Sequence, residues 1–148
     1  MSYHSPTMKI LLAVDGSEYS KRAAEYVAKH ASMLAEPPEI HLLHVHPPLP
    51  YHGAAKIVGK AAIEEYQREE SLAALAVAEK ALEGSRSAPI ASWAVGDVVE
   101  EVSRYVDKKG IDLIVVGSHG RGAVTILAMG SVTLKLLAGL KTPILVIR

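Results

Sequence analysis

Glycines recur in the segment GSHGRGAVTILAMGS, which covers residues 117–131. Gly117 and Gly120 follow an apolar run that predicts a buried strand, while Gly130 and Ser131 stand at the start of another apolar segment. A glycine lets the backbone come close to another group, and the unpaired N–H groups at the start of a helix favour an anion. We therefore interpret the segment as a loop and a helix start that hold a phosphate chain between them.

Other residues near these glycines have side chains suited to the same chemistry. Ser131 and Thr133 carry hydroxyl donors, and Arg121 could pair with a phosphate or simply be solvated. Simpler explanations of the glycines also exist, because glycines after a strand often only make a turn and Gly-Ser is an ordinary helix start. Two known phosphate motifs fit badly, since no Gly-Lys-Ser or Gly-Lys-Thr occurs and the turn after the first apolar run holds only Gly16.

Apolar runs alternate along the chain with segments that favour a helix, and this alternation predicts an α/β fold. Most of the runs are apolar throughout, which is typical of a parallel sheet covered by helices on both faces. The expected architecture is a single open, Rossmann-like sheet. The predicted strands cover residues 8–14, 39–46, 88–95, 111–117 and 143–148, and the predicted helices cover about 18–34, 61–82, 98–108 and 131–140.

Short polar motifs predict where two of these helices begin and end. Ser17 can cap the first helix with its hydroxyl group. Asp97, with Glu100 three residues later, is the aspartate version of a capping box, and Gly110 ends the helix that this box opens. Asp15 precedes the first of these helices at the tip of the first strand, where open α/β sheets bind their ligands.

Length and composition limit the function. With 148 residues, one domain over residues 1–148 can bury a sizeable core, and residues 1–7 are expected to be disordered and residues 47–59 to form a surface loop. Sixteen basic residues balance sixteen acidic ones, so neither a nucleic acid nor a membrane is an expected partner. The lack of cysteine, and of any apolar run near ~20 residues, fits a soluble protein of the cytoplasm.

The glycine segment resembles the signature of the universal stress proteins. Their nucleotide-binding members carry a glycine, two residues, a second glycine, nine residues, and a third glycine followed by serine or threonine. Gly117, Gly120, Gly130 and Ser131 match this spacing completely. The stretches KILLAVDGSEYSKRAAEYV, IHLLHVH, DLIVVGSHGRG and TPILVIR are similar to other parts of the family pattern. The resemblance covers nearly the whole chain and points to the ATP-binding subgroup.

The resemblance implies a five-stranded parallel sheet in the order 3-2-1-4-5, with ATP, AMP or a related nucleotide across the tips of strands one and four. It places Asp15 by the ribose and phosphates, and the backbone of Ala13 and Val45 by the adenine. Because a carboxylate beside phosphates is unfavourable, Asp15 should accept ribose hydroxyls or face Mg²⁺. The full candidate site is Ala13, Val14, Asp15, Val45, Val116, Gly117, His119, Gly120, Arg121, Gly122, Gly130, Ser131, Val132 and Thr133.

Three functions are consistent with such a site. The favoured one is a regulatory stress-response protein in which the bound adenine nucleotide acts as a switch, with no catalytic residue. A slow ATPase or other nucleotide hydrolase is the alternative, but such enzymes generally need a Ser-Gly-Gly-type loop where this chain has Asp15-Gly16-Ser17. A dimeric scaffold with an empty pocket is the third. The apolar segment 143–148 predicts an edge strand, and the resemblance implies that two copies form a homodimer through it.

His41, His44 and His46 are the most conspicuous group of metal-binding side chains. On a strand, His44 and His46 share one face, and two imidazoles at that spacing could bind a metal. No third ligand stands nearby in the sequence, so histidines satisfied by hydrogen bonds are the favoured interpretation. His119 is expected to contact the nucleotide and not to act as a general base, because no Ser/His/Asp arrangement surrounds it.

Overall fold

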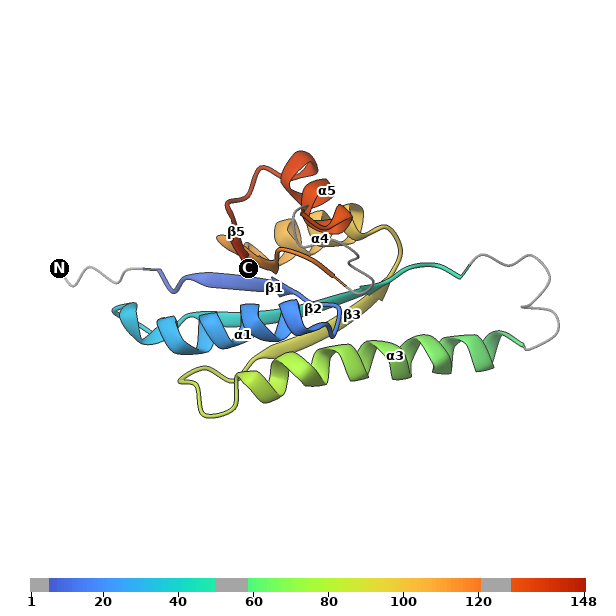
Figure 1. Cartoon of the computed structure of the whole chain (residues 1–148), viewed down its shortest axis with the longest axis horizontal. Helices are drawn as coiled ribbons and strands as arrows, with labels where there is room; N and C mark the ends of the chain where they lie inside the picture. Colours follow the sequence, from blue (N-terminus) through green and yellow to red (C-terminus); the bar gives the residue numbers. More distant parts are fainter. Residues whose placement is uncertain (1–5, 50–58, 121–128) are drawn as a thin grey trace.

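Five parallel strands form one sheet in the computed structural model (Figure 1), which describes residues 6–49, 59–120 and 129–148. The strands are β1 (Lys9–Ala13), β2 (Glu39–His46), β3 (Ile90–Val95), β4 (Leu113–Gly117) and β5 (Ile144–Ile147). They lie in the order β3-β2-β1-β4-β5, and each neighbouring pair is parallel. The α/β fold class and the strand order are therefore confirmed.

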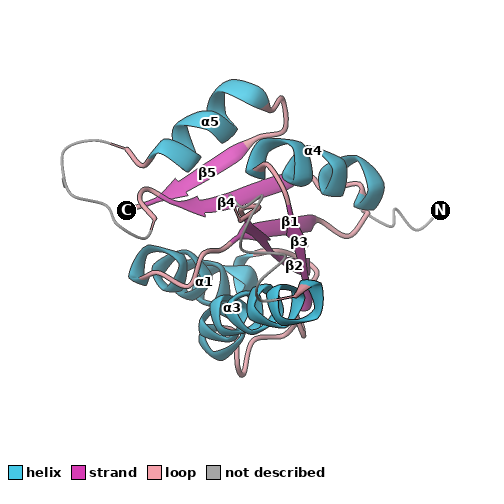
Figure 2. Cartoon of the chain, turned by 90° about the vertical axis from the view of Figure 1, so that its right-hand side faces the viewer, coloured by secondary structure: helices cyan, strands magenta, loops and turns pink. Residues whose placement is uncertain are grey.

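Helices cover both faces of this sheet. They are α1 (Glu18–His30), α3 (Lys60–Ala81), α4 (Val98–Lys109) and α5 (Ser131–Gly139), with a short 3₁₀ segment, η1 (Ala31–Met33), after α1. Figure 2 shows α1 and α3 on one face and α4 and α5 on the other. The first helix was expected to run to Leu34. It instead ends at His30 and tightens into η1, as helices often do in their last turn.

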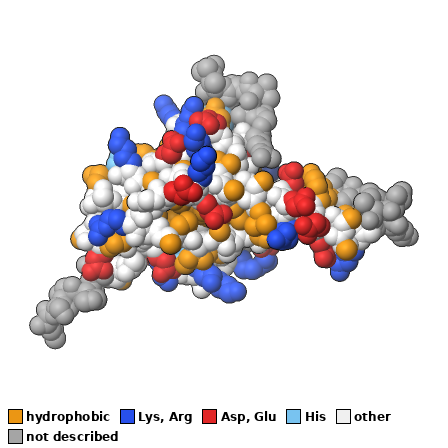
Figure 3. Space-filling model, turned by 90° about the horizontal axis from the view of Figure 1, so that it is seen from below, with side chains coloured by type: hydrophobic (Ala, Val, Ile, Leu, Met, Phe, Trp, Pro, Cys, Tyr) orange, Lys and Arg blue, Asp and Glu red, His pale blue; other side chains and the backbone are white. Residues whose placement is uncertain are grey.

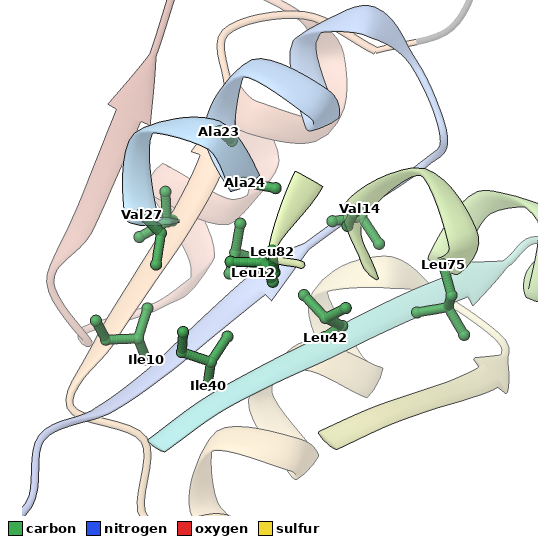
Figure 4. Close-up of a cluster of buried hydrophobic side chains, with 12 residues drawn as sticks. Ile10, Leu12, Val14, Ala23, Ala24, Val27, Ile40, Leu42, Leu75 and Leu82 are labelled. Carbon is green, nitrogen blue, oxygen red and sulfur yellow. The ribbon is translucent and has the colours of Figure 1, made fainter. Parts of the chain in front are cut away.

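Alternate residues of the central strands pack against opposite helix layers. Ile10 and Leu12 of β1 join the cluster under α1 and α3, shown in Figure 4, whereas Leu11 joins the cluster under α4 and α5. The same division separates Leu42 from Leu43 in β2. Because a strand directs successive side chains to opposite faces, a strand covered on both sides is mostly apolar at successive positions. This confirms why these runs do not alternate in polarity.

The predicted helix boundaries rest on side chains that act as expected. The Ser17 hydroxyl accepts the Ser20 N–H at 3.3 Å, and Asp97 Oδ1 accepts the Glu100 N–H at 3.0 Å. Gly110 ends α4 with φ of +69°, a conformation that glycine adopts without the strain that a side chain would add. The local sequence therefore determines the turns that follow β1 and β3.

Several sequence expectations lie outside the described residues. They concern residues 1–5, residues 50–58 of the expected surface loop, and the candidate site residues Arg121 and Gly122. Across the described ranges, no helix combines the length and apolar character needed to cross a membrane. On the face seen in Figure 3, basic and acidic side chains are intermixed over the surface.

Candidate functional site

A cavity of about 410 Å³ opens at the carboxyl ends of β1, β2 and β4. It lies between the turn that joins β3 to α4 and the first turns of α5, and its volume is within the range of about 300–1,000 Å³ that is usual for small-molecule sites. It is lined by Ala13, Val14, Asp15, Ser20, Leu43, Val45, Pro47, Pro48, Gly96, Asp97, Val98, Val116, Gly117, His119, Gly120, Val132, Thr133, Lys135 and Leu136.

The cavity brings together most of the candidate residues from three distant parts of the chain. Those that line it are Ala13, Val14, Asp15, Val45, Val116, Gly117, His119, Gly120, Val132 and Thr133. Gly130 and Ser131 do not line it, although they begin the helix that forms one wall. Hydrogen bonds explain the position of that helix: the Gly130 N–H donates to the Ser118 carbonyl at 2.7 Å, and the Thr133 hydroxyl donates to the Gly117 carbonyl at 2.8 Å.

The hydroxyl group of Thr133 is used within the fold. Thr133 was a candidate to hold phosphate through its hydroxyl group, but that hydrogen is donated to the Gly117 backbone, and the residue is buried. The Ser118 N–H in turn donates to the Ile147 carbonyl at 2.8 Å. These bonds fasten the start of α5 to the tips of β4 and β5, so Thr133 shapes the wall of the cavity.

Asp15 is held in place by three hydrogen bonds of the β1–α1 turn. Its Oδ1 accepts the Ser17 N–H at 2.9 Å and the Ser20 hydroxyl at 2.8 Å, while its own N–H donates to Ser20 Oγ at 2.9 Å. The carboxylate also lies just before the N-terminus of α1, where the helix dipole stabilises negative charge. Asp15 can thus remain charged at the edge of the cavity.

The three signature glycines stand where the chain packs against itself. A Cβ atom added to Gly117 would lie 2.7 Å from Tyr19 Cβ, one at Gly120 would lie 2.5 Å from Asp15 Oδ2, and one at Gly130 would lie 3.1 Å from His119 Cα. None of the three has a positive φ. Close packing against Tyr19 accounts for glycine at position 117 without a ligand, whereas the contacts at Gly120 and Gly130 are ones that a small shift of the neighbouring group can relieve.

His119 reaches the cavity from the loop after β4. Its Nδ1 lies 2.9 Å from Ser118 Oγ, and its ring lies 4.9 Å from the Tyr19 ring, centroid to centroid. Its Nε2 is buried and has no hydrogen-bond partner among the residues that the structure describes. His119 is therefore a lining residue held by α1 and its own loop.

Sequence reasoning missed nine of the lining residues, among them one whole wall and one positive charge; the other five are Ser20, Leu43, Pro47, Pro48 and Leu136. The missed wall consists of Gly96, Asp97 and Val98. The Gly96 N–H donates to the His46 carbonyl at 3.0 Å, and this hydrogen bond holds the wall against the end of β2. The rule that ligands bind at strand tips applied to β3 as well, but the pattern Gly-Asp there was used only to predict a helix cap. The missed charge is Lys135, which stands three residues after Val132 and so shares its helix face.

The histidines of β2 are satisfied by hydrogen bonds, as predicted. His41 is buried, with Nδ1 2.7 Å from the Tyr105 hydroxyl and Nε2 2.6 Å from Glu39 Oε1. His44 and His46 donate through Nδ1 to the Val14 and Pro47 carbonyls, at 2.7 and 2.8 Å. Within the described ranges, no three His, Asp or Glu side chains are grouped closely enough to hold a metal ion.

Tyr105 has a perturbed environment outside the cavity, at the other end of β2. Burial raises the pKa of its phenol above the ordinary 10.0, a hydrogen bond with Ser92 opposes this, and the charge of Glu39 adds to it. The phenol therefore stays neutral and bonded to His41. We assign this group to the packing of α4 on the sheet.

Comparison with known proteins shows similarity along the chain. A model of the universal stress protein family matches residues 6–148. A universal stress protein of Thermus aquaticus is 33% identical over 147 residues, covering 94% of this chain and 97% of that protein. The universal stress protein Slr1230 of Synechocystis is 31% identical over 140 residues, covering 95% of this chain, and the chain spans only 42% of that protein's length.

Solved structures share the fold. The protein MJ0577 superposes with a TM-score of 0.76 at 26% identity, over 97% of this chain and 96% of that one. An Arabidopsis thaliana universal stress protein with AMP bound has a TM-score of 0.65 at 19% identity, over 95% and 90% of the two chains. An Archaeoglobus fulgidus universal stress protein in complex with dAMP has a TM-score of 0.61 at 19% identity, over 97% and 100%. At such low identity, the last two show the fold alone.

Proposed function

The chain belongs to the universal stress protein family, and from this premise we propose that it binds an adenine nucleotide, ATP or AMP, in the cavity described above. Bound nucleotide would act as a switch for a regulatory role in the stress response. The observation that carries the proposal is the cavity itself, at the strand tips where open α/β sheets bind ligands. AMP and dAMP complexes of proteins with this fold support the choice of an adenine nucleotide.

The two ends of the cavity differ in chemistry. One end is mostly apolar, apart from Asp97, and this suits a purine base. Its apolar residues are Leu43, Val45, Pro47, Pro48 and Val98. Asp15, His119, Gly120 and the start of α5 form the other end, where backbone N–H groups and the positive end of a helix suit phosphates. We therefore orient the nucleotide with its base toward β2 and its phosphates toward α5.

Asp15 would serve the ribose or a magnesium ion carried by the nucleotide. Its Oδ1 already accepts two hydrogen bonds from the β1–α1 turn, which orients the carboxylate. Ribose hydroxyls are donors that a carboxylate accepts, and Mg²⁺ prefers carboxylate and phosphate oxygens. Either role allows a negative charge beside phosphates.

A binding role is favoured over hydrolysis by how the hydroxyl groups are used. Ser20 donates to Asp15, and Thr133 donates to the Gly117 carbonyl. Neither is hydrogen-bonded to an imidazole among the described residues. The Ser118 hydroxyl does lie 2.9 Å from His119 Nδ1, but Ser118 is buried and does not line the cavity. We therefore propose no catalytic residue, and a cytoplasmic location stays a prediction of the sequence.

We extend the proposal to a homodimer that forms through β5. This strand is one edge of the sheet and is apolar and half-buried. Leu134 and Leu137 of the preceding helix α5 are exposed as well. An open apolar edge favours pairing with a second strand, and a two-fold axis would let the two β5 strands pair antiparallel.

The binding proposal is tested by calorimetry with ATP, AMP and GTP, together with mass spectrometry of small molecules released from the purified protein. The blocking variant is Val132→Trp, because Val132 is 46% exposed and lines the cavity. The matched control is Ala138→Trp, at an exposed position of the same helix that lies outside the cavity and is not used in the dimer argument. We expect adenine nucleotides to bind the wild type and the control but not the blocking variant. Equal binding by all three proteins would contradict the proposed site.

A further inference from the structure

Lys135 is an exposed lysine of α5 that lines the cavity. Among the lining residues that the structure describes, it is the one lysine or arginine, and the carboxylates are Asp15 and Asp97. If Lys135 were absent, the charged side chains among these lining residues would be two carboxylates, which repel a polyanion. The positive charge of Lys135 can offset these carboxylates and so favour phosphate binding in the cavity.

The geometry of α5 directs this side chain toward the expected phosphate end. Val132, Lys135 and Leu136 line the cavity at the spacing i, i+3 and i+4, so they share one face of the helix. Lys135 is one turn from Ser131, about 6 Å along the helix axis. Side chains on a helix lean toward its N-terminus, so the long Lys135 side chain extends back over the first turn of α5.

The charge of Lys135 is not used elsewhere among the described residues. It takes part in none of the ion pairs that they form. The first turn of α5 has no acidic residue, whereas α1 has Glu18 and α4 has Glu100 and Glu101 in theirs. The positive end of a helix stabilises an anion, and Lys135, in the second turn of α5, adds a positive charge near that end. The local charges of α5 thus favour an anionic ligand.

We propose that Lys135 is a specificity-determining residue that binds the phosphate chain and makes affinity rise with the number of phosphates. This inference rests on the proposed function, because it assigns the nucleotide's phosphates to the α5 end of the cavity. A coulombic attraction grows with each added negative charge, whereas contacts to base and ribose stay the same. Lys135 therefore selects nucleoside di- and triphosphates over monophosphates and nucleosides.

The test measures affinities for adenosine, AMP, ADP and ATP by calorimetry in the wild type and in Lys135→Met, which keeps an unbranched side chain only one atom shorter but removes its charge. We expect adenosine affinity to change less than about twofold, AMP affinity to fall about threefold, and ATP affinity to fall about tenfold. Lys135→Arg should retain the wild-type order. Lys141→Met is the matched control, because Lys141 is exposed just after α5 and outside the cavity.

The outcomes separate the two proposals. A loss of affinity that is equal for all four ligands would show that Lys135 acts on the fold or on the base, and would overturn the inference. So would an unchanged affinity for ATP, or an effect of Lys141→Met as large as that of Lys135→Met. In each of these cases the wild type still binds, and the proposed function stands. A wild type that binds none of the four ligands overturns both.

Discussion

The hydroxyl group of Ser20 donates to Asp15 Oδ1 at 2.8 Å and accepts the Asp15 N–H at 2.9 Å, so one buried side chain holds the aspartate at both its backbone and its carboxylate. Ser20 stands in the first turn of α1, and Asp15 stands at the tip of β1. The position of the carboxylate at the cavity is therefore set by the start of the helix. This relationship leads to the first of five predictions.

Ser20→Ala removes both hydrogen bonds and should weaken nucleotide binding because Asp15 loses its orientation. We expect the free energy of unfolding to fall by about 1–2 kcal/mol and nucleotide affinity to fall severalfold. Urea titration and calorimetry at a temperature where the variant is fully folded separate the two effects. An affinity equal to that of the wild type would show that Ser20 serves only the fold.

Asp15→Asn tests the role of the charge with little change of shape. The asparagine Oδ1 can still accept from Ser17 and Ser20, so the β1–α1 turn should persist. If Mg²⁺ is the partner, ATP affinity should fall in magnesium buffer and stay equal or rise in EDTA. An equal loss in both buffers would reject the cation and favour the ribose, and no change in either would remove Asp15 from the site.

Gly117 and Gly120 should differ in how much an alanine substitution destabilises the fold. Gly117→Ala places a methyl group 2.7 Å from Tyr19 Cβ and 2.9 Å from its backbone carbon, so we expect the largest loss of stability there, about 1–3 kcal/mol. Gly120→Ala meets the Asp15 carboxylate instead, which a side-chain rotation can relieve. This variant should lose nucleotide affinity more than stability. Urea titrations that rank Gly120→Ala below Gly117→Ala in stability would contradict this assignment.

Tyr105 should make stability depend on pH in the alkaline range. Burial raises its pKa in the folded state above the ordinary 10.0, so its contribution is fully present below about pH 10 and is lost as the pH rises through the folded pKa. The stability difference between wild type and Tyr105→Phe should therefore shrink above pH 10. At neutral pH, Tyr105→Phe should cost about 1–3 kcal/mol, because it leaves the buried His41 Nδ1 without its partner. Urea titrations at pH 7 and above 10 measure both effects.

Val146→Pro should dissociate the proposed homodimer and leave the sheet intact. The carbonyls of Pro143 and Ile147 accept hydrogen bonds from β4, so the backbone of Val146, at the alternate position, faces the open edge. Proline there removes an outward donor, whereas Leu145→Pro would remove a donor to β4. Light scattering should find a wild-type dimer at micromolar concentration and a monomeric Val146→Pro variant. A monomeric wild type would contradict the dimer.

Much of the fold was predictable because its signals are local. The apolar runs of β1, β2 and β4 report burial on both faces, and Ser17, Asp97 and Gly110 mark helix ends through bonds or angles within a few residues. The strand order could not be predicted from the apolar runs themselves. It was predicted from the resemblance to the family. Several predicted strand ends differ from the observed ends by one or two residues, because hydrogen bonding to a neighbouring strand determines where a strand ends.

By itself, the sequence determined the α/β alternation, the helix caps and the clustering of candidate residues at three strand tips. Only the tertiary structure decided which atoms face the cavity. It assigned the Thr133 hydroxyl to the Gly117 carbonyl, placed Asp97 and Lys135 in the wall, and packed the glycines against Tyr19, Asp15 and His119. The physical reason is distance along the chain. A hydrogen bond between residues 16 positions apart, or a cavity shared by the turn after β3, β4 and α5, depends on how the helices pack on the sheet. No local sequence pattern encodes that packing.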